Sequence, residues 1–250
     1  MPGTRSLALF LLFLAAPLAI LVGAQTYPHA FPRKGVTKLF ENERVTAWDV
    51  RWLRDVPQPV HRHQFDMAGV YTVYGPIRVT SPDGAVSPVT PFEVPRPYFQ
   101  PKGVTHKEEA IGFPGAPERE AVMLDLKDVS FPPATKAGVP AAFPRDGARK
   151  AIDNERVFEW DYTWTTGRAV AQHIHERDSV EVFFDPGTIR YRTADGKEET
   201  KTFKRKNARF VARGTIDSEE AVSGGSYSGE YIAFALPPTS TPRSPLEVIR

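Results

Sequence analysis

The sequence predicts an all-β protein in which one domain occurs twice. Three observations support this prediction. Short apolar runs separated by turn signals recur about every 8–12 residues, which is typical of a sandwich or barrel. No stretch of about 12 residues beyond the N-terminal segment shows a helical stripe. A long segment near the start of the chain also recurs in its second half.

The repeat relates residues 31–52 (FPRKGVTKLFENERVTAWDVRW) to residues 143–164 (FPRDGARKAIDNERVFEWDYTW), at an offset of 112. Twelve of the 22 aligned positions are identical. The register continues through two His-x-His motifs and two Asp-Gly turns, with one deletion late in the second copy. Because solenoid repeats have periods of about 20–50 residues, this longer period indicates duplicated domains. The tetrapeptide Asn-Glu-Arg-Val, kept in both copies, suggests a shared structural constraint.

The expected strands come in pairs, one in each copy. Residues 44–52 and 156–164 alternate apolar and polar side chains at period two, and the tryptophans within them are expected in the core. The Asp-Gly turns supply the positive φ that tight hairpins need. Further strands are expected at 68–74, 121–126, 180–184 and 231–236.

The N-terminal segment is predicted to be a signal peptide. Arg5 precedes an apolar run, and small residues precede Gln25, as signal peptidase requires. A retained membrane anchor is the alternative, because the run approaches the roughly 18 residues that span a bilayer. The chain is thus divided into a signal peptide (1–24), a first domain (25–127), a linker (128–142) and a second domain (143–250).

The amino-acid composition limits the classes of function that the chain can have. Hydrophobic residues make up 41% of the chain and charged residues 25%, as in ordinary globular proteins. The net charge of +2 predicts no general attraction to nucleic acid, nor to a membrane after signal cleavage. There is no cysteine, so a metal site must use His, Asp or Glu. The predicted export implies a secreted or periplasmic location, and a bacterial periplasm is favoured. Without cysteine, the exported protein has no disulfide framework.

Five of the six histidines fall at two places in the repeat. Residues i and i+2 of a strand point to one face, so His61 and His63 aim two imidazoles into one space. His106, after a Pro-Lys-Gly-Val-Thr turn, could bring a third ligand from another strand. His173 and His175 repeat the first pair. His29, just beyond the predicted signal peptide, is expected to be solvated.

These motifs resemble the cupin superfamily, whose first motif is His-x-His followed by a Gly and whose second is Pro-x-Gly-x-x-His. His61, His63, Gly75 and the segment 101–106 match their order and spacing. The resemblance covers residues 31–236 and implies two tandem jelly-roll-like barrels with a metal in the first. It implies a divalent transition metal (Fe, Mn, Zn, Cu or Ni), a small-molecule ligand or substrate, and homodimerisation as an option.

Two departures from the family pattern matter. The family's carboxylate ligand is replaced by Met67 in the first copy and by Ser179 in the second. Asp66 and Asp178, one residue earlier, are expected on the opposite strand face unless a bulge turns them inward. In the second copy His106 is replaced by Asp217, which leaves a second or vestigial site of His173, His175 and Asp217.

The resemblance favours a metal-dependent enzyme, dioxygenase-like or isomerase-like, with a non-catalytic metal- or ligand-binding module as the alternative and a structural bicupin as a third. An open metal position would distinguish a reactive site from a structural one. The catalytic residues are not identified from the sequence. Tyr71, Tyr98 and Arg78 are candidates for proton handling. Glu108 and Glu109 could orient an imidazole or lie on an exposed face, and Glu219 and Glu220 repeat them.

Overall fold

The computed structural model describes residues 26–129, 131–223 and 226–234. The predicted signal peptide and the last two residues of the strand expected at 231–236 lie outside these ranges. The described residues form strands and connecting turns, and none of them belongs to a helix. Accordingly, no helix able to cross a membrane is found among them. The all-β prediction is confirmed.

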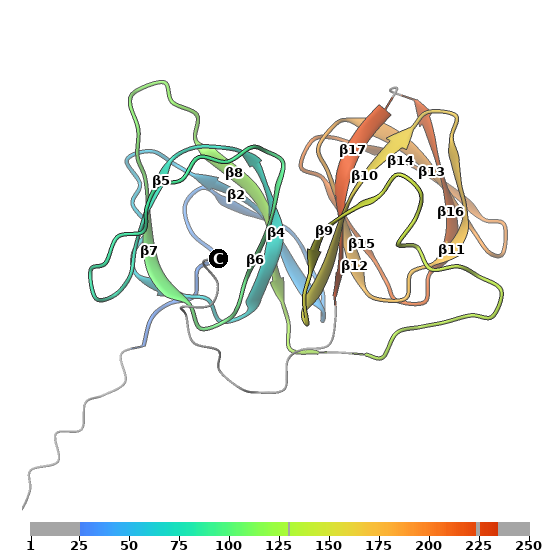
Figure 1. Ribbon diagram of the computed structural model, residues 1–250, viewed down its shortest axis with the longest axis horizontal. Helices are drawn as coiled ribbons and strands as arrows, with labels where there is room; N and C mark the ends of the chain where they lie inside the picture. Colours follow the sequence, from blue (N-terminus) through green and yellow to red (C-terminus); the bar gives the residue numbers. More distant parts are fainter. Residues whose placement is uncertain (1–25, 130, 224–225, 235–250) are drawn as a thin grey trace, which may run out of the picture.

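The first copy contains strands β1 to β8, which build two sheets (Figure 1). The larger sheet has the order β1-β2-β8-β4-β6 and the smaller one β3-β7-β5. Every strand pair in them is antiparallel. The strands are β1 (Val36–Glu41), β2 (Val45–Trp52), β3 (His61–Arg62), β4 (Asp66–Val73), β5 (Ile77–Thr80), β6 (Arg96–Gln100), β7 (Thr105–Ala110) and β8 (Arg119–Leu126).

The second copy repeats this plan with strands β9 to β17. Its larger sheet has the order β15-β12-β17-β10-β9 and its smaller one β11-β16-β13-β14. The strands are β9 (Arg149–Asp153), β10 (Val157–Thr165), β11 (Ala169–Ile174), β12 (Ser179–Phe183), β13 (Gly187–Thr193), β14 (Glu198–Phe203), β15 (Ala208–Val211), β16 (Ile216–Ser223) and β17 (Ser226–Phe234).

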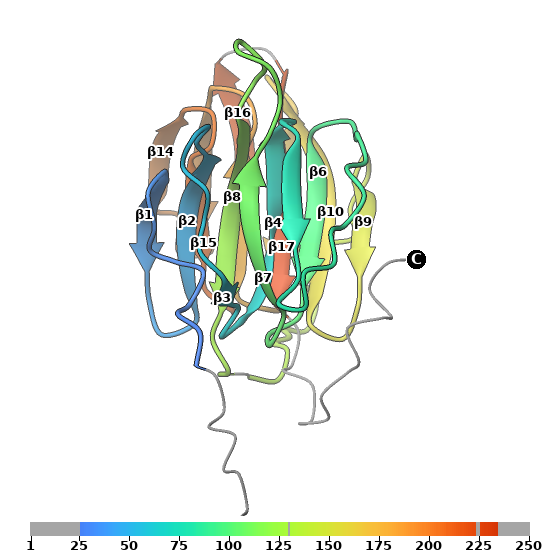
Figure 2. The same ribbon diagram turned by 90° about the vertical axis from the view of Figure 1, so that its left-hand side faces the viewer.

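The two larger sheets pack face to face and join the copies (Figures 1 and 2). One apolar cluster spans the contact, with Val45, Ala47 and Val122 from the first copy and Val180 and Ile232 from the second. Strand alternation explains it, since the other face of β2 sends Trp48, Val50 and Trp52 into its own barrel. The central strands are therefore buried on both faces.

The repeated Asn-Glu-Arg-Val segments lie at this junction. Asn42 Oδ1 accepts the backbone N–H groups of Arg44 and Val45, which closes the turn before β2. Asn154 does the same before β10. Each turn directs its arginine at the opposite copy, where Arg44 pairs with Asp178. Arg156 pairs with Asp66 in the same way, so both aspartates point away from the barrel interiors.

Candidate metal centre

Three imidazoles converge inside the first barrel. His61 lies on β3 directly opposite His106 on β7. His63 follows β3, where its N–H donates to Val104 O and its carbonyl accepts from Gly103 N–H. Arg62, between the two histidines, points outward and is exposed. Strand alternation therefore brings His61 and His63 to one face, as predicted from their spacing.

The nitrogens are close enough to share one ion. One ring nitrogen from each of His61, His63 and His106 lies within 4.8 Å of the others, and all three residues are buried. The Nε2 atoms of His63 and His106 are 3.3 Å apart. At a metal–nitrogen bond of about 2.1 Å, two ligands of one ion lie about 3–3.5 Å apart. The separation fits coordination of a shared ion.

Hydrogen bonding also prepares His61 for a metal. Its Nδ1 lies 3.0 Å from Pro59 O, which can only accept, so the proton sits on Nδ1. Its Nε2 is then a bare lone pair, and it is buried without a hydrogen-bond partner. A backbone carbonyl behind the ring is the usual support of a ligating histidine. This orphaned acceptor is the local observation that fits a bound cation.

Burial keeps these rings neutral. Desolvation lowers the pKa of His61 to about 4 and that of His63 to about 2, although the charge of Glu108 raises both in part. The pKa of His106 is also lowered, mainly by burial. Neutral imidazole is the form that binds metals.

Glu108 completes the surroundings of the three imidazoles. It lies two residues beyond His106 on β7, so it shares the inward face, and its Oε1 is 3.7 Å from His106 Nε2. Its Oε2 accepts from Arg33 at 2.6 Å and from Trp52 Nε1 at 2.9 Å. Burial alone would raise the pKa of Glu108, but Arg33 and the histidines hold it well below its usual range. An ionised carboxylate thus faces the cluster.

The second barrel holds a different set of ligands. His173, His175 and Asp217 come together as predicted, and Glu219 joins them, all four buried and within 4.8 Å of one another. Asp217 Oδ1 is 3.3 Å from His173 Nε2 and 3.2 Å from His175 Nε2. Glu219 Oε1 is 3.3 Å from His173 Nε2. The repeat could have revealed Glu219, because it is the counterpart of Glu108.

Arginines occupy the other oxygens of these two carboxylates. Arg145 lies 3.3 Å from Glu219 Oε2, which also accepts from Trp164, and Arg209 lies 3.5 Å from Asp217 Oδ2. Burial alone would lower the pKa of His173, but the Glu219 carboxylate, 3.3 Å away, raises it. The cluster could therefore hold a divalent cation, or a protonated His173 could take its place.

Comparison with known proteins shows which solved structures share this architecture. No protein-family model matches the sequence, and no curated protein matches it. Among solved structures, AerE from Microcystis aeruginosa is 12% identical with a TM-score of 0.60, covering 84% of this chain and 98% of its own. Oxalate decarboxylase from Bacillus subtilis, which has Mn(II) centres, is 11% identical with a TM-score of 0.56, covering 82% and 73%. A cupin 2 conserved barrel domain protein from Leptotrichia buccalis is 10% identical with a TM-score of 0.48, covering 80% and 88%.

The chain has a two-domain cupin fold. The predicted fold class is thereby confirmed. Met67, at the position where the family resemblance predicted a carboxylate ligand, is buried in the first barrel's core. Glu108 offers a carboxylate from β7 instead, next to His106 in sequence and in space.

Several predictions for single residues need correction. His29 is not solvated, because it is half-buried and its Nε2 bonds Asp125 Oδ2 at 2.9 Å. Arg78 pairs with Glu109 on the surface and does not face the site. The partners of His29 and Arg78 were not predicted because each lies far away in the sequence. Glu220 lies half-buried beside Arg190, which agrees with the outward-face alternative for this residue.

Tyr71 and Tyr98 do lie within the first barrel. Their rings are 5.1 Å apart, and Tyr98 donates to Gln100. Burial raises the pKa of Tyr71 to about 12 and that of Tyr98 well above its usual value. Both hydroxyls therefore remain protonated at neutral pH, which makes them proton donors and not bases.

Proposed function

We propose that the first barrel binds one divalent transition metal through His61, His63 and His106 and is a metal-dependent enzyme for a small organic acid. The observation that carries this proposal is the convergence of three buried, neutral imidazoles with an ionised Glu108 beside them. Three imidazole ligands leave open positions on most transition metals. The reaction classes that fit are dioxygenation, isomerisation and decarboxylation.

Each residue has a separable role. The metal would act as a Lewis acid that orients and polarises an oxygen of the substrate. Glu108 lowers the net charge of the centre, and Arg33 with Trp52 holds its carboxylate in place. Tyr71 and Tyr98, which stay protonated, can donate hydrogen bonds within the same barrel. Decarboxylation is supported by the similarity in fold to a manganese-containing oxalate decarboxylase.

Metal analysis of the purified protein tests the binding half of the proposal. His106→Ala should remove the metal of the first barrel, because it deletes one of three ligands. Glu108→Gln should weaken binding about 10- to 100-fold, as expected for a group that supports the ligands. Glu109→Gln is the matched control, since Glu109 is exposed and pairs with Arg78. Unchanged metal content in His106→Ala would reject the site.

A non-catalytic metal- or ligand-binding module is the second candidate. The burial of the three ligands favours it, because His61, His63 and His106 are only 2%, 3% and 8% exposed and a substrate has little direct access. A panel of small dicarboxylic acids, thiols, diketones and phenols separates the candidates. Turnover that requires metal and disappears in folded His106→Ala supports the enzyme. Full metal loading with no turnover supports the binding module.

We further propose that the protein is exported and loses residues 1–24. The support is the apolar segment with small residues before Gln25. Mass spectrometry of the natural protein should find a mature N-terminus at Gln25. An intact Met1 in a membrane fraction would instead support a retained anchor.

A further inference from the structure

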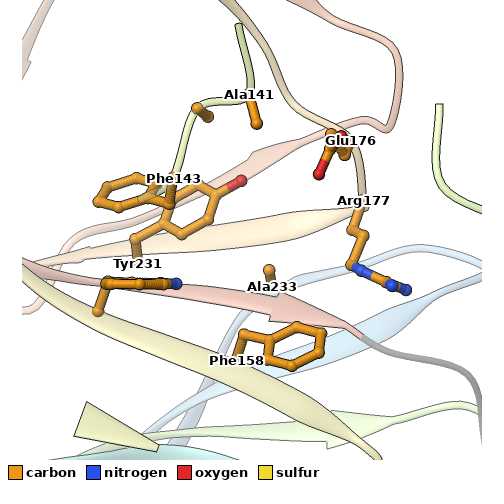
Figure 3. A pocket seen from close by; sticks show the side chains of 9 residues that line it. Ala141, Phe143, Phe158, Glu176, Arg177, Tyr231 and Ala233 are labelled. Carbon is orange, nitrogen blue, oxygen red and sulfur yellow. The ribbon is translucent and has the colours of Figure 1, made fainter. Parts of the chain in front are cut away.

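A cavity of about 260 Å³ opens in the second barrel, away from the three-histidine centre (Figure 3). It is close to the lower end of the range of about 300–1,000 Å³ in which small-molecule sites fall. Tyr231 forms part of its wall, and its hydroxyl lies 3.2 Å from His175 Nδ1. The cavity therefore lies on the Nδ1 side of the His175 ring, whereas the four-residue cluster lies on its Nε2 side.

The wall of this cavity has an aromatic side. Phe143 and Tyr231 stack with ring centroids 4.2 Å apart, and Trp160 stacks on Phe143 at 5.8 Å. Phe158 completes the aromatic lining (Figure 3). Such rings give a rigid surface for an apolar or aromatic group.

Two opposite charges lie on the other side. Glu176 and Arg177 are adjacent and border the cavity, and Figure 3 shows both on the side opposite Phe143. Neither forms an ion pair with any residue in the described part of the chain. Arg177 Nη1 is buried without a hydrogen-bond partner, while its guanidinium lies 5.2 Å from the Phe158 ring. The guanidinium has no carboxylate partner among the described residues, so an anion bound in the cavity would form a charge-assisted hydrogen bond with the part of it that borders the cavity.

In the first barrel, side chains fill the space that corresponds to this cavity. The offset of 112 relates Ala141 to His29, and strand pairing relates Ala233 to Asp125. In the first copy both His29 Nε2 and the Trp48 indole N–H bond to Asp125 Oδ2. In the second copy the two alanines leave this space open.

The charged positions differ in the same way. The counterparts of Glu176 and Arg177 in the first copy are Gln64 and Phe65, which carry no charge. The charged pair and the two alanines that line the cavity therefore occur together in the second copy, and the first copy has neither. A site that must bind both an anion and a cation accounts for this coincidence.

We propose that this cavity binds a small zwitterion, an α-amino acid with an aromatic or bulky apolar side chain. Its carboxylate pairs with Arg177, its ammonium group with Glu176, and its side chain packs on Phe143, Trp160 and Tyr231. This site goes beyond the proposed function of the first barrel and does not depend on it.

Three ligands test the proposal by calorimetry on the mature full-length protein. L-Phenylalanine carries both charges, 3-phenylpropionate lacks the ammonium group, and phenethylamine lacks the carboxylate. We expect one L-phenylalanine per chain, bound at least tenfold more tightly than either analogue. The proposal is overturned if L-phenylalanine shows no binding at 10 mM (about −2.7 kcal/mol). It is also overturned if L-phenylalanine binds no more tightly than the analogues.

Substitutions test which residue contacts each charged group of the ligand. Arg177→Gln should weaken L-phenylalanine at least tenfold and leave phenethylamine unchanged. Glu176→Gln should weaken L-phenylalanine equally and spare 3-phenylpropionate. Arg168→Gln, at an exposed site, is the matched control. The double variant Ala141→His/Ala233→Asp, which copies the filling of the first barrel, should abolish binding. Changes below twofold in both charge variants would overturn the assignment.

Discussion

Arg44 of the first barrel donates its Nε–H to Asp178 of the second at 2.6 Å, and Arg156 of the second returns the contact to Asp66 of the first at 2.8 Å. All four side chains are buried. The aspartates are further tied down, since Asp178 accepts from Arg213 N–H and Asp66 from Lys102 N–H. The duplicated Asn-Glu-Arg-Val turn is thus a reciprocal clamp between the two copies.

Breaking one arm of this clamp should destabilise the protein strongly. Asp178→Asn leaves Arg44 buried without its counter-charge, which typically costs about 3–5 kcal/mol. Urea unfolding measures the change. The exposed pair of Arg192 and Glu198 supplies the control, because Glu198→Gln should cost less than about 1 kcal/mol. Equal effects of the two substitutions would show that the clamp contributes no more than a surface pair.

The sequence predicted the repeat and the alternation of the strands, but not the clamp. Period-two alternation says that Ala47 and Trp48 face opposite ways. It does not say whether the outer face meets water or another sheet. That depends on which surfaces pack together, and the sequence pattern at residues 44–52 contains no such information. Asp66 and Asp178 therefore had a predicted direction without a predicted partner.

The candidate site was predictable where it depends on local geometry. His61 and His63 share a face because they are two residues apart, and the same rule places Glu108 beside His106. His29 was placed wrongly because its partner, Asp125, is 96 residues away. No local pattern indicates a contact between an N-terminal segment and a distant strand.

The junction also contains an unusual pair of acids. Strand pairing places Glu159 and Glu230 where the first copy has Ala47 and Val122, and both glutamates are fully buried. None of their carboxylate oxygens has a hydrogen-bond partner among the described residues. Burial, with the neighbouring Glu159, raises the pKa of Glu230 to about 9. Burial also raises the pKa of Glu159 well above its usual value.

The contribution of Glu230 to stability should therefore fall as pH rises from about 4.5 to about 9. Across this window folded Glu230 keeps a proton that the unfolded chain has lost, so each rise in pH favours unfolding. Glu230→Gln removes this titration and should raise the free energy of unfolding at pH 8 by about 1–3 kcal/mol. Urea unfolding at pH 5 and pH 8 measures it. Exposed Glu93→Gln is the control, and a pH dependence that persists in full in Glu159→Gln/Glu230→Gln would contradict the assignment.

The two clusters should differ in metal preference. Two carboxylates and two imidazoles favour harder ions such as Mn²⁺, whereas three imidazoles favour Cu²⁺, Ni²⁺ or Zn²⁺. We expect His106→Ala to keep about one equivalent of Mn²⁺ and Asp217→Asn/Glu219→Gln to lose it. Elemental analysis with Mn²⁺ resonance spectra measures both. A His106→Ala protein without Mn²⁺ would show that a protonated His173 neutralises Glu219 instead.

The pair of His29 and Asp125 makes a prediction about removing one partner or both. His29→Ala leaves Asp125, which is 1% exposed, with the Trp48 indole as its remaining side-chain donor, and should cost about 1–3 kcal/mol. His29→Ala/Asp125→Ala removes the buried charge as well and reproduces Ala141 and Ala233 of the second copy. Because an unpaired buried group costs more than an absent pair, the double variant should be the more stable of the two in urea unfolding. A double variant less stable than His29→Ala would mean that Asp125 stabilises the barrel through its bond to Trp48 alone.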